Sequence, residues 1–265
     1  IAAMPARHRD NDRKSGAILR ATGLTKHYGG VVANSDINFT VNHGELRGII
    51  GPNGAGKTTF FNLITGFFPP TSGNIILDGR DITHANATRR VHMGLARTFQ
   101  ITEIFPELTV RENIQIAVEV ATGFRMRPWI GRGEGARVRD RIDELLTATG
   151  LTAQAERLVG EMSHGDQRAA EIAMALALRP RILLLDEPTA GMGEQETYQI
   201  ARLIRQLHKQ NGFTIVLIEH DMRVVFNLAD RIMVLAEGRP LAEGTPAEIA
   251  ADPAVQTAYL GKAET

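Results

Sequence analysis

Short runs of large apolar residues recur along this chain, and longer stretches with helical spacing separate them. Residues 46–50, 182–185 and 213–218 form such runs. Runs of this length between turn residues are typical of strands that are buried on both faces of a parallel sheet. Residues 194–210 instead place apolar side chains on one face of a helix, namely Ile200, Leu203, Ile204 and Leu207. Buried strands that alternate with amphipathic helices predict an α/β fold.

Weaker apolar segments extend this pattern toward both ends of the chain. Alternation predicts a half-buried strand at 37–41, and an Asp-Gly turn ends a short strand within 74–80. Strands on either side of Glu237-Gly238 are predicted to form a hairpin. The remaining expectations are strands at 18–21 and 94–100, and helices at 82–93, 222–228 and 246–260.

Helical periodicity replaces short strands from residue 101 to residue 177. Thr109 and Glu112 have the spacing of a capping box at the start of a helix. We interpret residues 101–177 as a helical subdomain inserted in the α/β core of a single folded unit, 17–262. Residues 1–16 are polar and basic without an apolar core, which argues against a secretory signal and predicts a disordered tail in which Met4 is a candidate start.

A glycine-rich segment between the strand at 46–50 and the next helix carries the clearest chemical signal. It matches the pattern G-x-x-x-x-G-K-[ST] of a phosphate loop, with a strand before it and a helix after it. Its successive N–H groups can cradle phosphate oxygens, and the helix adds its positive end. The lysine can reach the outer phosphates, and the last hydroxyl suits Mg²⁺. The alternative is a glycine-rich turn without a nucleotide. The segment consists of Gly51, Pro52, Asn53, Gly54, Ala55, Gly56, Lys57 and Thr58.

Polar side chains end two of the predicted buried strands. Asp186 and Glu187 follow the apolar run 182–185, and His220 follows the run 213–218. Ligands of α/β proteins bind at the carboxyl ends of the strands, and a charge placed there is costly unless a cation uses it. Asp186 is therefore the expected acid that holds Mg²⁺ through water, and Glu187 is positioned to activate water. The alternative is an acidic pair that merely ends a strand.

Two other candidate binding residues can equally be explained by a purely structural role. Tyr28 is either a core or edge-strand residue or a stacking surface for adenine. Ser163, with Gly165 beside it, begins a helix and either simply caps it or marks a second anion site.

Composition narrows the function classes. The chain has 265 residues, 43% of them hydrophobic and 23% charged, which is typical of a soluble globular protein. Lys plus Arg and Asp plus Glu both number 30, which argues against a broad nucleic-acid surface, so no nucleic-acid partner is expected. The absence of cysteine excludes disulfides, thiolate metal sites and a Cys nucleophile. No apolar run approaches the roughly 18 residues of a membrane-spanning helix.

These motifs occur in a fixed order. The phosphate loop comes first, then Gln100 at a strand end, the helical block, Ser163-His164-Gly165-Asp166-Gln167, Leu185-Asp186-Glu187-Pro188 and finally His220. This order resembles the ATP-binding subunit of ABC transporters over residues 17–261. The resemblance implies a P-loop NTPase (RecA-like) core with an N-terminal antiparallel β subdomain and an inserted helical signature subdomain.

The resemblance also implies a role for each matching residue. Tyr28 would stack on adenine. The residues from Gly51 to Thr59 would hold the phosphates, and Thr58 would bind Mg²⁺. Gln100 would bind Mg²⁺ and the attacking water and report to a membrane partner. Asp186 would support Mg²⁺, Glu187 would be the general base, and His220 would contact the γ-phosphate.

A second subunit is part of the same expectation. Ser163 and Gly165 would bind the γ-phosphate of ATP held by a second copy, in a head-to-tail dimer, so that an isolated monomer binds ATP but hydrolyses it poorly. Two positions depart from the family pattern. The usual Leu-Ser-Gly-Gly-Gln is Met162-Ser163-His164-Gly165-Asp166 here, and Gly193 stands where many members have Asp.

Shorter motifs are similar to the branched-chain amino acid and urea/amide uptake group. They are Ala190-Gly191-Met192, Ile218-Glu219-His220-Asp221-Met222, Glu243-Gly244-Thr245-Pro246 and Ala258-Tyr259-Leu260-Gly261. The expected function is a Mg²⁺-dependent ATPase at the cytoplasmic face of the membrane. It would drive import of a small solute, namely branched-chain or other hydrophobic amino acids, through separate permease subunits. Alternatives are the ATPase of a urea/amide importer, the similar lipopolysaccharide-export ATPase, a non-transport ABC ATPase, or a regulatory module that binds nucleotide without turnover.

Overall fold

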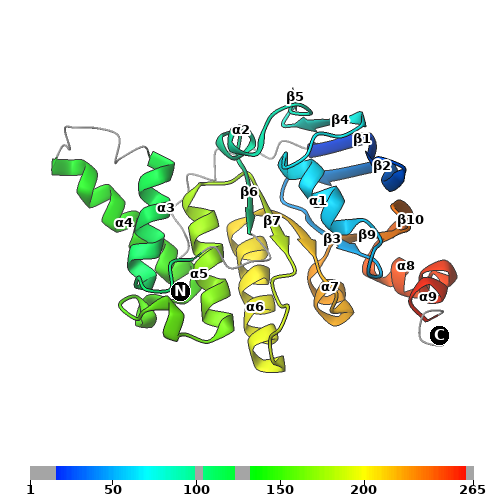
Figure 1. The fold of residues 1–265 in the computed structure, drawn as a ribbon. Helices are drawn as coiled ribbons and strands as arrows, with labels where there is room; N and C mark the ends of the chain where they lie inside the picture. The colour runs from blue at the N-terminus through cyan, green and yellow to red at the C-terminus, as the bar shows by residue number, and fades with distance from the viewer. Residues whose placement is uncertain (1–15, 99–103, 123–131, 261–265) are drawn as a thin grey trace.

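The computed structural model describes residues 16–98, 104–122 and 132–260. A central sheet with helices on both of its faces and a second, smaller sheet make up this part of the chain (Figure 1). None of the helices in these ranges is both long and apolar enough to span a membrane.

The central sheet has the strand order β10-β9-β3-β8-β7-β6. Its pairs are parallel except for the hairpin of β9 and β10, which turns at Glu237 and Gly238 with positive φ at both residues. The sequence predictions of a parallel sheet and of this hairpin are therefore confirmed. The bounds are β3 (Leu46–Ile50), β6 (Leu95–Thr98), β7 (Ile182–Asp186), β8 (Thr214–Ile218), β9 (Arg231–Ala236) and β10 (Arg239–Gly244).

The second sheet is antiparallel, with the order β2-β1-β4-β5. Its strands are β1 (Ala17–Tyr28), β2 (Val31–Asn42), β4 (Ser72–Leu77) and β5 (Arg80–Asp81). The first two are much longer than the predicted strands at 18–21 and 37–41. Their outer ends are exposed, as at Val31 and Val32. A backbone ladder can continue there without an apolar face, so the apolar pattern could not reveal these ends.

The core lies on both faces of the central sheet. Leu183 and Leu185 of β7 join one apolar cluster, while Ile182 and Leu184 join the other. This alternation follows from the two-residue period of a strand. The second cluster fills the space between the two sheets together with α1 (Lys57–Thr65), whose Phe60 lies edge-on to Phe39 of β2.

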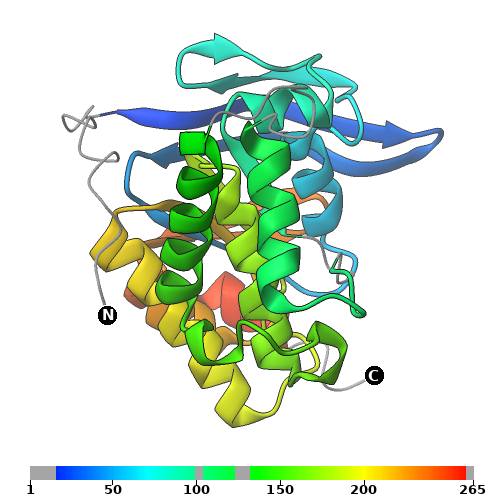
Figure 2. The same cartoon turned by 90° about the vertical axis from the view of Figure 1, so that its left-hand side faces the viewer.

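The helical block lies at the end of the molecule opposite to α8 and α9, the helices of residues 246–260 (Figure 1). Helices α3 (Val110–Thr122), α4 (Arg132–Thr149) and α5 (His164–Ala177) lie side by side (Figure 2). The predicted capping box is present, because the Glu112 carboxylate accepts from Thr109 N at 2.8 Å. Short 3₁₀ turns at Thr152–Gln154 and Val159–Glu161 connect α4 to α5. The domain boundaries at 17, 101, 177 and 262 stay predictions.

The remaining helices are α2 (Ala87–His92), α6 (Glu194–Asn211), α7 (Met222–Leu228), α8 (Pro246–Ala251) and α9 (Pro253–Leu260). The expectation of one helix over 246–260 is wrong. Asp252 is extended, with φ −76° and ψ 117°, because the residue before a proline is disfavoured in the helical region. The helix expected at 82–93 is confined to 87–92 and begins at the cap Asn86.

Arg90 joins α1 to α2 from inside the protein. Its guanidinium donates to the carbonyls of Leu63 and Ile64 at 2.6 and 2.5 Å, and to those of Thr83 and Ala85 at 2.9 Å each. Burial lowers the pKa of Arg90 to about 10, against the opposing effect of Asp81. A cation at the carboxyl end of α1 also complements the helix dipole.

Replacing Arg90 with Met should lower the free energy of unfolding by about 3 kcal/mol, because buried carbonyls lose a charged donor. Arg89→Met, at the exposed neighbouring position, should change it little. Denaturant titration of both variants tests this, and equal stabilities would contradict the role of Arg90.

Asp230 ties the loop before β9 to α6 and β3. Its carboxylate accepts from Leu46 N at 2.9 Å and pairs with Lys209 Nζ and His208 Nε2, each at 3.0 Å. Burial raises the pKa of this carboxyl group, but the hydrogen bonds from Leu46 N and Lys209 and the electrostatic effect of His208 and Lys209 outweigh it, so the pKa lies below its ordinary value.

A depressed carboxyl pKa adds stability above the unfolded pKa, and this stability disappears as the pH falls through the folded pKa. We therefore expect the stability difference between wild type and Asp230→Asn to be full at about pH 5 and to shrink toward about pH 3. Urea titrations between these pH values measure it. A difference that stays constant would show that the ionised form is not favoured by folding.

Candidate nucleotide-binding site

The glycine-rich segment forms the loop between β3 and α1, as its sequence context predicts. Helix α1 begins at Lys57 after Gly56, which has φ 92°. A Cβ on Gly56 would lie 2.6 Å from both the carbonyl oxygen of Ala33 and the side-chain nitrogen of Asn34. Only glycine fits this backbone against the start of β2, and the loop is fixed there by the hydrogen bond from Asn34 Nδ2 to Gly56 O at 3.2 Å.

Lys57 is the cation of the loop and is only 5% exposed. Its Nζ donates to the carbonyls of Gly51 at 2.6 Å and Pro52 at 3.1 Å. Burial lowers the pKa of Lys57, and the charges of Glu187 and Asp186 partly oppose this shift. The lysine therefore lies in the field of both predicted acids, although its present hydrogen bonds are to backbone oxygens. Thr58 and Thr59 follow it in the first turn of α1.

The two acids lie where the sequence placed them, at the carboxyl end of β7. Asp186 is 1% exposed, and its carboxylate pairs with Arg97 Nη2 at 2.6 Å. Burial raises the pKa of Asp186, and the guanidinium of Arg97 opposes that effect. The guanidinium of Arg97 therefore offsets part of the cost of an ionised carboxylate at this buried position.

Glu187 and His220 meet across neighbouring strands. Their side chains approach to 2.6 Å between Oε1 and Nε2, since β7 and β8 are parallel and end at the same edge. Glu187 has φ 46°, and its N–H donates to Ile218 O at 2.9 Å. The buried Glu219 adds a further connection by accepting from Thr189 N at 2.8 Å. The carboxylate and the imidazole are thus close enough to exchange a proton.

Arg97 is a site residue that sequence reasoning missed. Besides Asp186 it contacts Asn62 Oδ1 of α1 at 2.7 Å, and its guanidinium lies over the rings of Phe61 and Phe67. The only signal in the sequence was an arginine inside a predicted strand. Its partners are distant along the chain, so their proximity could not be read from local pattern.

Tyr259 of α9 is a second missed contact. Its hydroxyl lies against the backbone of Gly51, the first residue of the loop, and burial raises the pKa of Tyr259 to about 12. The closing segment of the chain therefore packs against the phosphate loop.

The predicted anion site at α5 lies elsewhere. Ser163 caps the helix by accepting from Asp166 N at 3.1 Å, and Gly165 N donates to Glu196 Oε1 at 3.2 Å. Among the residues described, no hydrogen bond joins Ser163 or Gly165 to residues 51–58. The structure therefore brings together the loop, the two acids and His220, but not the helix cap.

Two other predicted residues have different outcomes. Tyr28 is 43% exposed, so it is not a core residue. It lies edge-on to Phe68, with 6.0 Å between ring centroids, at the outer end of β1. Gln100 falls outside the described residues.

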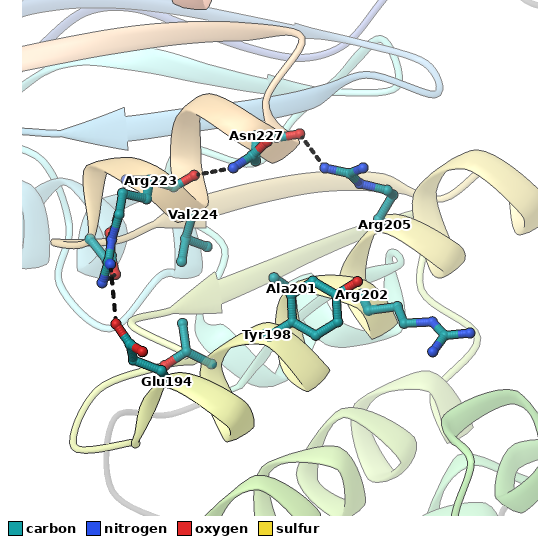
Figure 3. A pocket seen from close by; sticks show the side chains of 10 residues that line it. Glu194, Tyr198, Ala201, Arg202, Arg205, Arg223, Val224 and Asn227 are labelled. Carbon is teal, nitrogen blue, oxygen red and sulfur yellow. Dashed lines mark hydrogen bonds and ion pairs between the residues drawn. The ribbon is translucent and has the colours of Figure 1, made fainter.

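A cavity of about 370 Å³ lies between α6 and α7 (Figure 3). Tyr198, Ala201 and Val224 give it apolar surface, and Arg223 reaches Glu194 at its edge. None of the predicted site residues lines this cavity. The nucleotide site is therefore defined by the loop and the strand ends, not by this hollow.

Comparison with known proteins agrees with this geometry. Residues 34–190 match the family model described as ABC transporter, and residues 239–265 match the one described as branched-chain amino acid ATP-binding cassette transporter. The chain is 40% identical over 252 residues to the high-affinity branched-chain amino acid transport ATP-binding proteins BraF of Pseudomonas aeruginosa and LivG of Escherichia coli, and the matches cover 93% of this chain and 98% of each relative. This chain belongs to the ABC transporter family, as an ATP-binding subunit.

More distant matches show the breadth of the family. The lipopolysaccharide export system ATP-binding protein LptB of Escherichia coli is 33% identical, with 93% of this chain and 98% of LptB covered. The ADP conformation of the ATP-binding cassette MJ1267 superimposes with a TM-score of 0.79 at 29% identity, covering 92% of this chain and 99% of that one. The predicted fold class, a P-loop NTPase core with an antiparallel β subdomain, is confirmed.

Replacing Lys57 with Ala should weaken nucleotide binding roughly 10- to 100-fold, the equivalent of one or two hydrogen bonds from a charged group. Titration with a fluorescent ATP analogue measures the dissociation constant. Lys209→Ala removes the same charge at an exposed position on α6 and is the matched control. Equal affinities for the two variants would show that Lys57 does not bind phosphate.

Proposed function

We propose that this chain binds and hydrolyses ATP to drive import of branched-chain or other hydrophobic amino acids through separate membrane subunits. The observation that carries the proposal is the placement of a phosphate loop, a buried lysine, two carboxylates and a histidine at one edge of a parallel sheet. The names of its relatives BraF and LivG support the substrate class.

In this proposal the loop residues Gly51–Thr59 hold the phosphates of ATP. Backbone N–H groups and the positive end of α1 face the phosphate oxygens, and Lys57 exchanges its carbonyl partners for them. Tyr28 supplies an exposed ring for adenine at the outer end of β1. Phosphate oxygens are better partners for an ammonium group than neutral carbonyls, so the exchange favours binding.

The residues at the site fit a magnesium ion. Thr58 and Asp186 offer the oxygen donors that Mg²⁺ prefers, with Gln100 as a further candidate. Arg97 pairs with Asp186 in this structure, so a bound Mg²⁺ would share this carboxylate with the guanidinium or take its place. When bound, Mg²⁺ neutralises charge that develops on the phosphates.

Glu187 is the proposed general base. It accepts a proton from the attacking water, and the hydrogen bond from His220 orients its carboxylate. His220 would also contact the γ-phosphate. Both side chains keep some exposure, which leaves room for water to reach the carboxylate.

The complete site needs a second ATPase subunit in this proposal. Ser163 and Gly165 would contact ATP held by the other subunit, because they lie apart from the loop of their own chain. The dimeric structure of the cassette MJ0796 bound to ADP and Pi, which is 27% identical and covers 86% of this chain, supports pairing into a dimer. Gly193 cannot supply the side-chain contact that an Asp would make there.

The permease subunits would hold the protein at the cytoplasmic face of the membrane. A second candidate function is lipopolysaccharide export, which the likeness to LptB supports. The match of residues 239–265 to the branched-chain amino acid model favours import, as do the closer relatives.

Glu187→Gln should leave ATP binding intact and reduce turnover more than roughly 100-fold, because a neutral amide cannot take a proton from water. Phosphate release and ATP binding are measured together, and size-exclusion chromatography with ATP should show an accumulated dimer. Glu194→Gln, a nearby exposed carboxylate, is the control and should keep its turnover. Full hydrolysis by Glu187→Gln would overturn the role of the base.

A further inference from the structure

We propose that Glu196 is an internal competitor for phosphate at the start of α5. Its carboxylate accepts the hydrogen bond of Gly165 N–H in the subunit alone. This hydrogen bond breaks when ATP bound to a second subunit approaches. This inference rests on the proposed function, since it assigns that N–H to the partner's γ-phosphate.

The contact joins two elements that are far apart in the sequence. Gly165 lies in the first turn of α5, and Glu196 lies in the first turn of α6. Glu196 Oε1 accepts from Gly165 N at 3.2 Å, while Oε2 accepts from Gly193 N at 3.4 Å. One carboxylate therefore bridges the signature helix and the loop that follows the catalytic acids.

The absence of a side chain at Gly165 makes this approach possible. A Cβ at that position would lie 3.3 Å from Glu196 Cβ and 3.4 Å from its Cγ. The side chain of Glu196 thus crosses directly over the backbone of the helix start, where the helix dipole favours an anion. A carboxylate and a phosphate oxygen are both anionic acceptors, and one N–H cannot serve both fully.

Comparison with the other helix caps shows that Glu196 does more than cap its own helix. Glu112 and Glu248 hold the same third position in α3 and α8, and they accept from the cap N–H at 2.8 and 2.7 Å. The corresponding distance for Glu196 is 3.4 Å. Its carboxylate caps α6 at a longer distance, while its other oxygen accepts from Gly165 N at 3.2 Å.

The consequence concerns dimer formation. Before ATP can bridge the two subunits, the bond between Glu196 and Gly165 must open and the negative charge must move away from the incoming phosphate. Neutralising Glu196 should therefore promote the ATP-bound dimer, whereas the loss of an ordinary cap would only destabilise α6 or leave dimer formation unchanged.

The test compares Glu196→Gln with Glu194→Gln, both in the Glu187→Gln background that suppresses turnover. Glu194 belongs to the same turn of α6 but is 88% exposed and faces Arg223. Dimer formation is followed by light scattering during titration with ATP, and binding of a fluorescent ATP analogue to the monomer is measured at low protein concentration. Glu196→Gln should lower the ATP concentration at half-maximal dimer formation by roughly 3- to 10-fold, without tighter binding to the monomer.

Each outcome has a defined meaning. An unchanged or higher midpoint for Glu196→Gln relative to Glu194→Gln overturns the competitor role and leaves the proposed function intact. An equal decrease for both variants shows a general charge effect and also overturns it. If ATP binds to none of the proteins, the proposed function fails and this inference fails with it.

Discussion

The cost of burying charge is the constraint on which this structure depends. Asp186, Lys57 and Arg97 are almost fully enclosed at one edge of the central sheet. An isolated charge in such a place would be destabilising by several kcal/mol, so each needs a fixed partner. Arg97 neutralises Asp186 and also holds Asn62 of α1, while Lys57 is bound by carbonyl oxygens of its own loop. Arg97 thus links the acid strand to the first helix, while the hydrogen bonds of Lys57 hold the loop to itself.

The topology of the sheet explains why these groups meet. Strands β3, β8 and β7 are neighbours and parallel, so the phosphate loop, His220 and Glu187 leave the sheet at the same edge. Local pattern was sufficient to predict this part, because buried strands of this kind are continuous apolar runs and their polar ends are easily seen. The capped start of α5 at Ser163 could also be read from residue types alone. The order of the motifs predicted the remaining site residues, because it identified the family.

Other features depend on contacts that no local pattern encodes. Arg97 and Arg90 looked like ordinary polar positions of a strand and a helix, yet their partners are remote or are backbone carbonyls. The outer halves of β1 and β2 are held by a backbone ladder whose side chains are exposed, so apolar alternation is missing there. The break between α8 and α9 is different, because Pro253 is visible in the sequence and disfavours a helical conformation at Asp252.

Both halves of the proposed site are satisfied internally in the free subunit. Lys57 has carbonyl partners, Asp186 has Arg97, and the N–H of Gly165 has Glu196. Binding of ATP would therefore exchange existing hydrogen bonds for new ones rather than fill unpaired groups, and the net free energy of such an exchange is small compared with the gross interaction. A modest net gain in free energy keeps the association of the subunits reversible, which repeated cycles of ATP binding and hydrolysis require. It also means that a single internal partner such as Glu196 can adjust the ATP concentration at which two subunits join, because small differences in free energy decide the balance.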